Sequence, residues 1–253
     1  MTWQESGQPR FGAWLQMGSA EIAAELIAAG YDYVGIDCQH SLISPADAGR
    51  LLREFAGSAT RAAVRVPSHA FADIGKVLDA GADIVIVPMV NTAEEATAIA
   101  RAARLPPDGD RSFGPIRRDL SRQAADINGR VTCLAMIETA QGVAHVDDIL
   151  GVDGIDGIYV GPKDLSLSLG LSETLVPPSS ELLSTVRGLA QSARRAGKIA
   201  GLHAGAGDNA HHYLACGFTF LTLAADSAMI RSAAASHLSA ARAAVAATGQ
   251  APT

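Results

Sequence analysis

The feature of this sequence that most constrains its fold is a unit that recurs along the whole chain. Each copy has a short run of apolar, often β-branched residues, then a turn, then an Ala- and Leu-rich segment with apolar residues at helical spacing. Eight strand-like runs occur at residues 11–17, 33–38, 61–66, 83–90, 131–138, 157–161, 199–203 and 218–224. The helix-like runs between and after them are residues 19–29, 45–55, 73–80, 93–104, 140–150, 180–196, 208–215 and 228–247. Strict alternation of strand and helix indicates an α/β protein with parallel strands and right-handed crossovers.

Eight units in 253 residues predict a closed (β/α)8 TIM barrel, because such barrels typically have about 250 residues. An open, doubly wound sheet is the structural alternative. No linker or low-complexity stretch interrupts the chain, so residues 1–253 are predicted to form a single domain. The longest break, residues 106–120, is a polar loop rich in Pro and Arg. Glycines predict four helix ends, at Gly30, Gly81, Gly197 and Gly217, and the predicted helix N-caps are Ser19, Ser44, Thr92 and Ser179.

The composition excludes several classes of partner. The net charge is −6 and no run of Lys or Arg occurs, which argues against binding to nucleic acid. No apolar run approaches the roughly 18 residues that a membrane span needs, and no signal peptide is apparent. Three widely separated cysteines do not suggest a disulfide framework. A cytoplasmic enzyme that contacts neither membrane nor nucleic acid is therefore expected.

In a barrel, the residues that directly follow the strands line the active site. These positions are rich in groups that bind metals, transfer protons or bind carboxylates: Gln16, residues 37–40, Arg65, residues 88–89, Glu138, residues 161–164, His203 and Asp226.

Two acids in this set follow neighbouring strands. Glu138 ends the fifth strand-like run and Asp164 follows the sixth. Adjacent carboxylates repel one another unless a cation or a proton lies between them, so a divalent metal ion is the natural occupant. The alternatives are a helix N-cap for Asp164 and an ordinary surface acid for Glu138.

Three basic side chains are further candidates. His40 is placed to act as a general base, or else it is a solvated loop histidine. Arg65 ends a Val-rich strand, where it would stabilise negative charge on a substrate or pair with an acid of the barrel. Lys163 could form a Schiff base, although its place beside Asp164 favours a contact to substrate. The loop Gly205–Ala206–Gly207 is a weak candidate for phosphate binding, because no basic residue accompanies it.

Five short motifs in this order resemble the metal-dependent (class II) pyruvate aldolases, typified by 4-hydroxy-2-oxoheptanedioate aldolase and 2-keto-3-deoxy-L-rhamnonate aldolase. They are Asp-x-x-His, Val-Arg-x-Pro, Leu-Asp-x-Gly-Ala, Ile-Glu-Thr and Gly-Pro-x-Asp-Leu-Ser, and the resemblance covers nearly the whole chain. It implies an aldehyde-lyase that reversibly cleaves a 4-hydroxy-2-oxo acid between C3 and C4, giving pyruvate or a related 2-oxo acid and an aldehyde. Such enzymes serve the catabolism of aromatic compounds or sugar acids.

The resemblance also implies roles for individual residues. Glu138 and Asp164 would bind Mg²⁺, Mn²⁺ or Co²⁺. His40 would accept a proton, Arg65 would stabilise the enolate, and Asp79 would raise the basicity of His40. Met136, Lys163 and Asp164 would contact the substrate.

Asp79 lies at the end of its predicted helix, which places it at the opposite end of the barrel from His40. We therefore expect Asp79 to serve the His40 of a neighbouring subunit in a homo-oligomer, a trimer or hexamer. The chain departs from the family's pattern at Gln39, Met136, Lys163 and His203. These departures bear on the substrate more than on the chemistry. The alternatives are another metal–enolate lyase or a thioester-cleaving enzyme on the same barrel, a Schiff-base aldolase that uses Lys163, and a non-catalytic binding protein.

Overall fold

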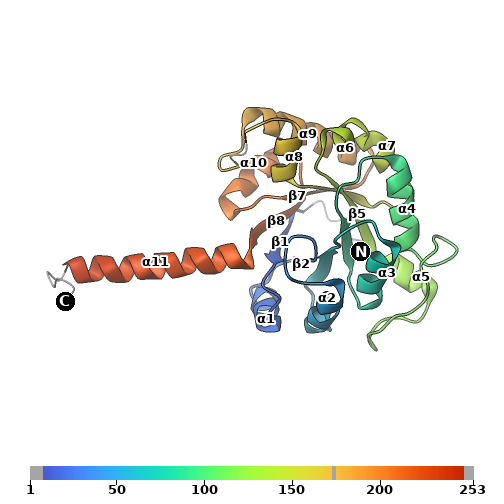
Figure 1. Ribbon diagram of the computed structural model, residues 1–253, viewed down its shortest axis with the longest axis horizontal. Coiled ribbons are helices and arrows are strands. Elements are labelled where there is room, and N and C mark those ends of the chain that lie inside the picture. The colour runs from blue at the N-terminus through green and yellow to red at the C-terminus, as the bar shows by residue number, and fades with distance from the viewer. Residues whose placement is uncertain (1–7, 173–174, 248–253) are drawn as a thin grey trace.

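Eight parallel strands, hydrogen-bonded in chain order and closed by pairing of the last strand with the first, form the centre of the molecule. The computed structural model describes residues 8–172 and 175–247 (Figure 1). The strands are β1 (Arg10–Leu15), β2 (Tyr33–Asp37), β3 (Arg61–Arg65), β4 (Ile84–Val87), β5 (Thr132–Ile137), β6 (Gly157–Val160), β7 (Ile199–His203) and β8 (Phe220–Ala225). The prediction of a TIM barrel is confirmed, and the open sheet is excluded.

Helices and short 3₁₀ turns connect the strands. The α-helices are α1 (Ala20–Ala28), α2 (Pro45–Leu51), α3 (Phe71–Asp79), α4 (Ala93–Ala103), α5 (Ala124–Arg130), α6 (Ala140–Ala144), α7 (Val146–Leu150), α8 (Pro162–Ser168), α9 (Ser180–Arg195), α10 (Ala210–Cys216) and α11 (Asp226–Ala247). The 3₁₀ turns are η1 (Leu52–Phe55) and η2 (Gly207–Asn209).

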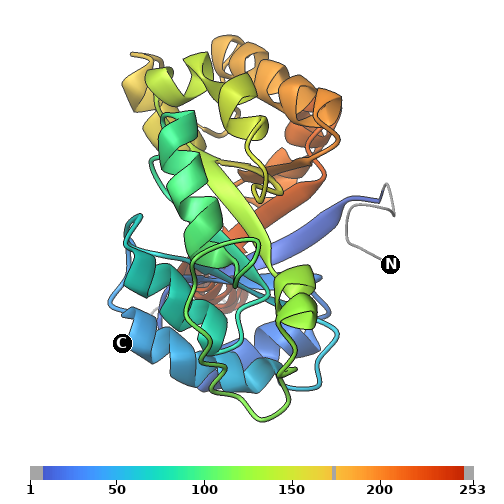
Figure 2. The ribbon, with the colours of Figure 1, turned by 90° about the vertical axis from the view of Figure 1, so that its right-hand side faces the viewer.

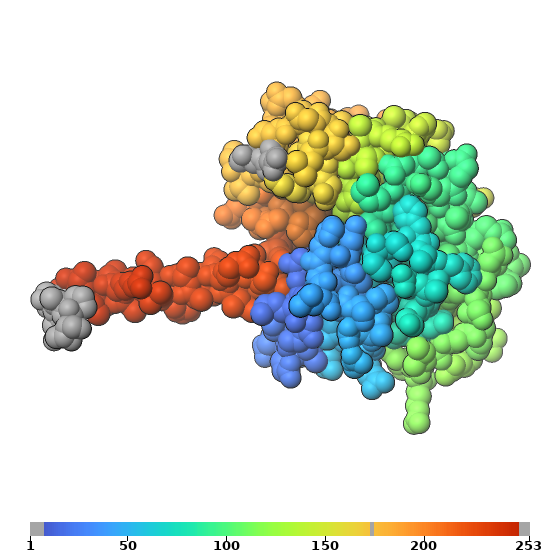
Figure 3. Space-filling view, viewed as in Figure 1, coloured from blue at the N-terminus to red at the C-terminus, as the bar shows by residue number. Residues whose placement is uncertain are grey.

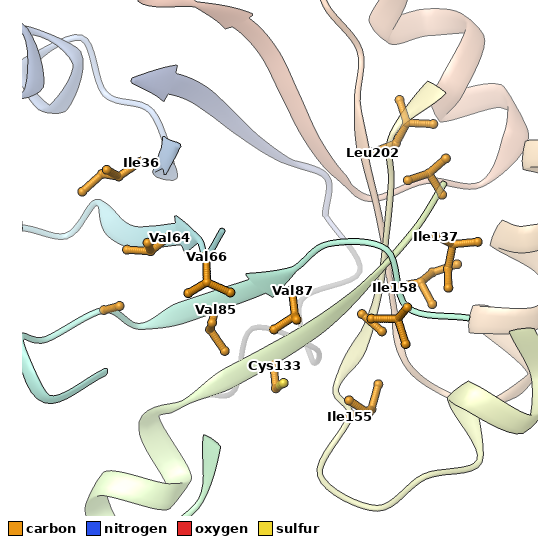
Figure 4. Packing of buried hydrophobic residues seen from close by; sticks show 14 of the residues in the cluster. Ile36, Val64, Val66, Val85, Val87, Cys133, Ile137, Ile155, Ile158 and Leu202 are labelled. Carbon is orange, nitrogen blue, oxygen red and sulfur yellow. The ribbon is translucent and has the colours of Figure 1, made fainter. Parts of the chain in front are cut away.

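The strands are apolar on both faces because each face is covered. Their outward side chains, such as Val64 and Val85, pack under the surrounding helices (Figure 4). Their inward side chains fill the barrel with an aromatic cluster that includes Trp14, Tyr33, Tyr159 and Phe220. Burial on both sides explains why these strands are continuous apolar runs without alternation.

Glycine makes room for the aromatic rings inside the barrel. A Cβ atom at Gly12 would lie 2.3 Å from the ring of Tyr33, and one at Gly35 would lie 2.3 Å from the ring of Trp14. The hydroxyl groups of Tyr33 and Tyr159 both hydrogen-bond the Thr222 hydroxyl, at 2.8 and 2.6 Å. Large and small side chains therefore alternate across the barrel, and the buried hydroxyls satisfy one another.

The predicted helix caps are confirmed. The side chains of Ser19, Ser44, Thr92 and Ser179 each accept a hydrogen bond from a backbone N–H in the first turn of the helix that follows. The four predicted terminal glycines have positive φ, for example +103° at Gly217. Only glycine adopts this conformation without a steric cost.

Two local features differ from the sequence prediction. The run at residues 140–150 is two helices, α6 and α7, that meet at His145. The Pro- and Arg-rich loop is followed by a short helix, α5, that apolar spacing did not indicate. Figure 2 shows this loop in green, extending below the barrel before it enters α5.

The last helix does not return to the barrel. α11 leaves the end of β8 and projects outward (Figures 1 and 3), and Asp226 is its only buried residue. Ile230 and Leu238 are about half exposed, at 47 and 52%. In the part of the chain that the structure describes, no helix, α11 included, meets the length and hydropathy of a membrane span.

Candidate active site

A cavity of about 290 Å³ opens at the C-terminal ends of the strands, where the sequence predicted the active site. Its lining comes from seven of the eight strands or the segments after them: Trp14, Gln16, His40, Arg65, Met136, Tyr159, Gly161, Pro162, Lys163, Asp164, Leu175, His203, Gly205 and Ala225. Five of the seven predicted site residues, His40, Arg65, Met136, Lys163 and Asp164, therefore share one cavity.

Arg65 is held rigidly by Asp37 at the ends of β3 and β2. Its Nε donates to Asp37 Oδ1 at 3.0 Å and its Nη2 donates to Asp37 Oδ2 at 2.8 Å, with both side chains buried. Burial by itself would raise the pKa of Asp37. The hydrogen bonds and charge of Arg65, together with the N–H groups of His40 and Gln39, outweigh burial and lower this pKa to about 2. Asp37 is therefore a carboxylate throughout the physiological range.

This ion pair is the alternative that the sequence left open for Arg65, and it leaves part of the guanidinium available. No residue in the described part of the chain accepts a hydrogen bond from Arg65 Nη1. The guanidinium carbon lies 5.3 Å from the centroid of the Trp14 ring. Arg65 is thus fixed in orientation by a carboxylate and an aromatic face while it still lines the cavity.

Glu138 lies beside the cavity, at the end of β5, and is almost fully buried. The pKa of Glu138 is raised to about 7, mainly by burial and to a smaller extent by the negative charge of Asp164. The N–H of Met89, which donates to Oε1 at 2.8 Å, and the charge of Arg65 act in the opposite direction. A carboxyl in this position holds a proton near neutral pH unless another cation replaces it.

Met89 reaches Glu138 through an unusual backbone conformation. Its φ is +57°, the left-handed region that residues other than glycine rarely adopt. A strained residue whose N–H donates to a buried carboxylate is typical of a functional site.

Asp164 and Lys163 lie in the first turn of α8, which begins with Pro162 after the N-cap Gly161. Asp164 is therefore not the helix N-cap, which was the alternative for this residue. Gly161 keeps the neighbouring space open, since a Cβ atom there would lie 2.8 Å from Glu138 Oε2 and 2.7 Å from Met136 Cε. The absence of a side chain at Gly161 leaves room beside the Glu138 carboxylate.

His40 and Asp79 are not brought together within one chain. His40 is exposed at the rim of the cavity. Asp79 ends α3 at the opposite end of the barrel, where its carboxylate lies 3.5 Å from Arg111. Burial raises the pKa of Asp79, and the charge of Arg111 opposes this effect. The Oδ1 atom of Asp79 is buried without a hydrogen-bond donor among the described residues.

Sequence reasoning placed the cavity correctly but missed parts of its support. It included Asp37 among the residues at the barrel mouth without pairing it with Arg65, although an acid at the end of the adjacent strand was a usable signal. It gave no role to Trp14, and nothing in the sequence marks the positive φ of Met89.

The acids of the site suit a divalent cation that shares its coordination with water and substrate. In the described residues, no group of three or more His, Cys, Asp or Glu side chains forms a complete metal cage. Mg²⁺ and similar ions are commonly bound through one or two carboxylates and keep several positions for water or substrate oxygens. Glu138 and Asp164, with the open space at Gly161, fit this kind of site.

Comparison with known proteins agrees with this geometry. Residues 10–233 match the model of the family described as HpcH/HpaI aldolase/citrate lyase. The chain belongs to this family. It is therefore a carbon–carbon lyase of the aldolase type, as the motifs indicated.

Individual relatives are also aldolases or members of the same family. The chain is 41% identical to a hydroxypyruvate/pyruvate aldolase of Rhizorhabdus wittichii over 95% of its own length and 97% of the relative. It is 33% identical to the 2-keto-3-deoxy-L-rhamnonate aldolase of Escherichia coli K12, over 87 and 84% of the two chains. A crystal structure of an HpcH/HpaI aldolase/citrate lyase family protein from Burkholderia cenocepacia superimposes with a TM-score of 0.86 at 29% identity, covering 94 and 96%.

Proposed function

We propose that this family member is a class II aldolase that reversibly cleaves a 4-hydroxy-2-oxo acid at the C3–C4 bond, giving pyruvate or a related 2-oxo acid and an aldehyde. The observation that carries the proposal is that a rigid Arg65 and Asp164 line one cavity, with Glu138 directly beside it. Cleavage leaves an enolate, and a preorganised cation next to a pair of acids suits the stabilisation of that charge.

Glu138 and Asp164 would hold the metal, Mg²⁺, Mn²⁺ or Co²⁺. When bound, such an ion supplies Lewis-acid polarisation of the 2-oxo group. Glu138 must lose its proton to bind a cation, and the N–H of Met89 orients its carboxylate.

The other residues act on the substrate directly. Arg65 stabilises the negative charge that develops on the 2-oxo acid, because Asp37 and Trp14 fix the guanidinium before substrate arrives. His40, at the rim, accepts the proton of the C4 hydroxyl and returns a proton to the enolate. Met136 and Lys163 contact the substrate from the ends of β5 and β6.

The active form is a homo-oligomer, a trimer or hexamer, and α11 supports this part of the proposal. At 100° per residue, Ile230, Ala234, Leu238, Ala241 and Val245 share one face of α11, while Ser232, Ser236 and Ser239 lie opposite. A helix of 22 residues with an apolar stripe, held away from its own barrel, is suited to cover a second copy of the chain.

Asp79 fits the same assembly. Since it lies at the far end of the barrel from His40, it would raise the basicity of a His40 that a neighbouring subunit presents. The chain would act in the cytoplasm as a single aldolase domain whose substrates are small molecules. It would bind neither nucleic acid nor membrane. Its buried free cysteines and its acidic charge agree with this proposal.

The test is release of pyruvate from a racemic 4-hydroxy-2-oxo acid before and after chelation, with Mg²⁺, Mn²⁺ or Co²⁺ restored in turn. We expect chelation to abolish release and at least one of the three ions to restore it. Turnover that survives chelation and is trapped by borohydride would replace this proposal with a Schiff base at Lys163.

A further inference from the structure

Two polar side chains in the cavity, Gln16 and His203, are not used by the proposed reaction, and Gln16 hydrogen-bonds Asp37. His203 is the last residue of β7, and it follows Leu202, which is buried under the helices. The alternation of side chains along a strand turns His203 toward the barrel interior. Its ring there packs edge-on against Trp14, with 5.5 Å between centroids and an interplanar angle of 75°.

The ring nitrogens of His203 have no partner in the protein, as far as the described residues show. None of those residues forms a hydrogen bond or ion pair with the ring, which lines the cavity. Burial, and then the charge of Arg65, lowers the pKa of His203 to about 4, although the charge of Asp37 acts in the opposite direction. The imidazole is therefore neutral at physiological pH, with one nitrogen as donor and the other as acceptor.

His203 comes from a different wall of the cavity than the groups assigned to the metal and the 2-oxo acid. The acids of the site come from the β5 and β6 side, and Arg65 comes from β3. Strands β1 and β2 and the segments after them contribute Trp14, Gln16 and His40. The wall along β7 and β8 includes Gly205 and Ala225, which occupy little space. Among the described lining residues of this wall, His203 alone has a polar side chain.

We infer that His203 is the residue that selects the aldehyde, by hydrogen-bonding a hydroxyl group on the carbon next to the aldehyde carbon. The inference rests on the proposed aldol reaction and narrows its substrate to α-hydroxyaldehydes. A hydroxyl both donates and accepts, so it can satisfy the donor or the acceptor nitrogen of the ring. An aldehyde without this hydroxyl leaves a buried polar group unpaired, and sites built around such a hydrogen bond discriminate strongly against the analogue that lacks it.

The experiment compares lactaldehyde with propanal, which differ only by the hydroxyl group, as acceptors for pyruvate in the metal-loaded enzyme. The wild type should prefer lactaldehyde in kcat/KM by about tenfold or more. His203→Leu, which replaces the imidazole with an apolar side chain, should remove most of this preference. His203→Gln, which keeps a donor and an acceptor, should retain part of it. A preference that is unchanged in His203→Leu would overturn the inference. This includes a variant whose kcat/KM falls by the same factor for lactaldehyde and for propanal.

A second readout separates this inference from the proposed function. Exchange of the methyl protons of pyruvate for deuterium in D₂O requires enolate formation but no aldehyde. If the wild type does not exchange, the proposed function fails. If exchange is normal and the preference for lactaldehyde is the same in wild type and His203→Leu, only the inference about His203 fails. His203→Leu could instead slow the exchange of hydroxypyruvate but not of pyruvate. The ring would then contact the hydroxyl group of the 2-oxo acid and not that of the aldehyde, which would also overturn the inference.

Discussion

Asp37 shows how much of the site depends on one buried carboxylate. It holds Arg65 through two hydrogen bonds, accepts the N–H groups of Gln39 and His40, and receives a hydrogen bond from the Gln16 side chain at 3.3 Å. Strands β1, β2 and β3 therefore meet at this one side chain. Its low pKa reflects the stabilisation of its charge by Arg65 and the backbone N–H groups in the folded protein.

Replacing Asp37 with Asn should make the stability difference from wild type depend on pH. A folded-state pKa of about 2, below an unfolded value near 4, gives stability that is fully present above pH 4 and lost as pH falls through 2. The wild-type advantage in the free energy of unfolding should therefore be about 1 kcal/mol smaller at pH 3 than at pH 7. Urea unfolding at both values measures it.

The matched control for this change is Asp208→Asn, which removes an exposed acid near the cavity. It should show no such pH-dependent difference. A wild-type advantage over Asp37→Asn that is the same at pH 3 and pH 7 would mean that Asp37 carries no special charge stabilisation.

Glu138 and Asp164 should determine metal affinity. Titration of metal-free protein with Mn²⁺, followed calorimetrically, should give affinities weaker by at least about tenfold in Glu138→Gln and in Asp164→Asn. Because the pKa of Glu138 is about 7, a proton competes with the metal, so wild-type affinity should also fall as pH drops below 7. Glu94→Gln, at an exposed acid of α4, is the control. Unchanged Mn²⁺ affinity in both ligand variants would disprove the assignment.

At the scale of single elements, the segment from β6 into α8 shows why glycine stands at position 161. Gly161 is the N-cap of α8, and its φ of −98° is one that any residue can adopt. The requirement for glycine is therefore one of space beside Glu138 and Met136 and not of backbone conformation.

Gly161→Ala should consequently weaken Mn²⁺ binding by about tenfold while the barrel stays folded. The new Cβ would displace the Glu138 carboxylate or the Met136 side chain. Circular dichroism checks the fold, and Gly170→Ala, where an added Cβ meets nothing within 4 Å but φ is positive, controls for the general cost of losing a glycine. Full Mn²⁺ affinity in Gly161→Ala would show that the space at Gly161 has no role in the site.

The elements also show what the sequence could and could not predict. Caps such as Ser44 and Gly217 depend on local chemistry, so both were predictable. Met89 in the left-handed region and the break at His145 depend on what packs against them, and neither has a local signal. The residues at the strand ends were predictable because barrel topology fixes them, whereas the pairing of Arg65 with Asp37 required knowledge of the register between β2 and β3.

At the scale of the whole molecule, the direction of α11 away from the barrel is the feature that the repeating pattern did not predict. Its spacing indicates a helix, but spacing does not say whether a helix packs on its own barrel or on another one. The structure shows it projecting from β8, with the buried carboxylate of Asp226 accepting the N–H groups of Gln16 and Met17 at its base. This anchoring fixes the direction in which α11 leaves the barrel.

Substitution on the apolar face of α11 should break the assembly. We expect Ile230→Asp and Leu238→Asp to shift the protein toward monomers in sedimentation-velocity experiments, because a charge would be buried in the contact between subunits. Ser239→Asp adds the same charge on the opposite face and should leave the assembly intact. A protein that is monomeric before any substitution would contradict the proposed oligomer.

The most direct measurement is deuterium exchange at the methyl group of pyruvate, followed by NMR in D₂O with Mg²⁺, Mn²⁺ or Co²⁺ present. It isolates enolate formation at Glu138, Asp164 and Arg65 from any question about the aldehyde. Exchange should require the metal and should fall by about 10²- to 10³-fold in Arg65→Lys, which cannot reproduce the paired contacts of the guanidinium with Asp37. Exchange that persists without metal, or at the wild-type rate in Arg65→Lys, would show that this cavity does not form the enolate in the way proposed.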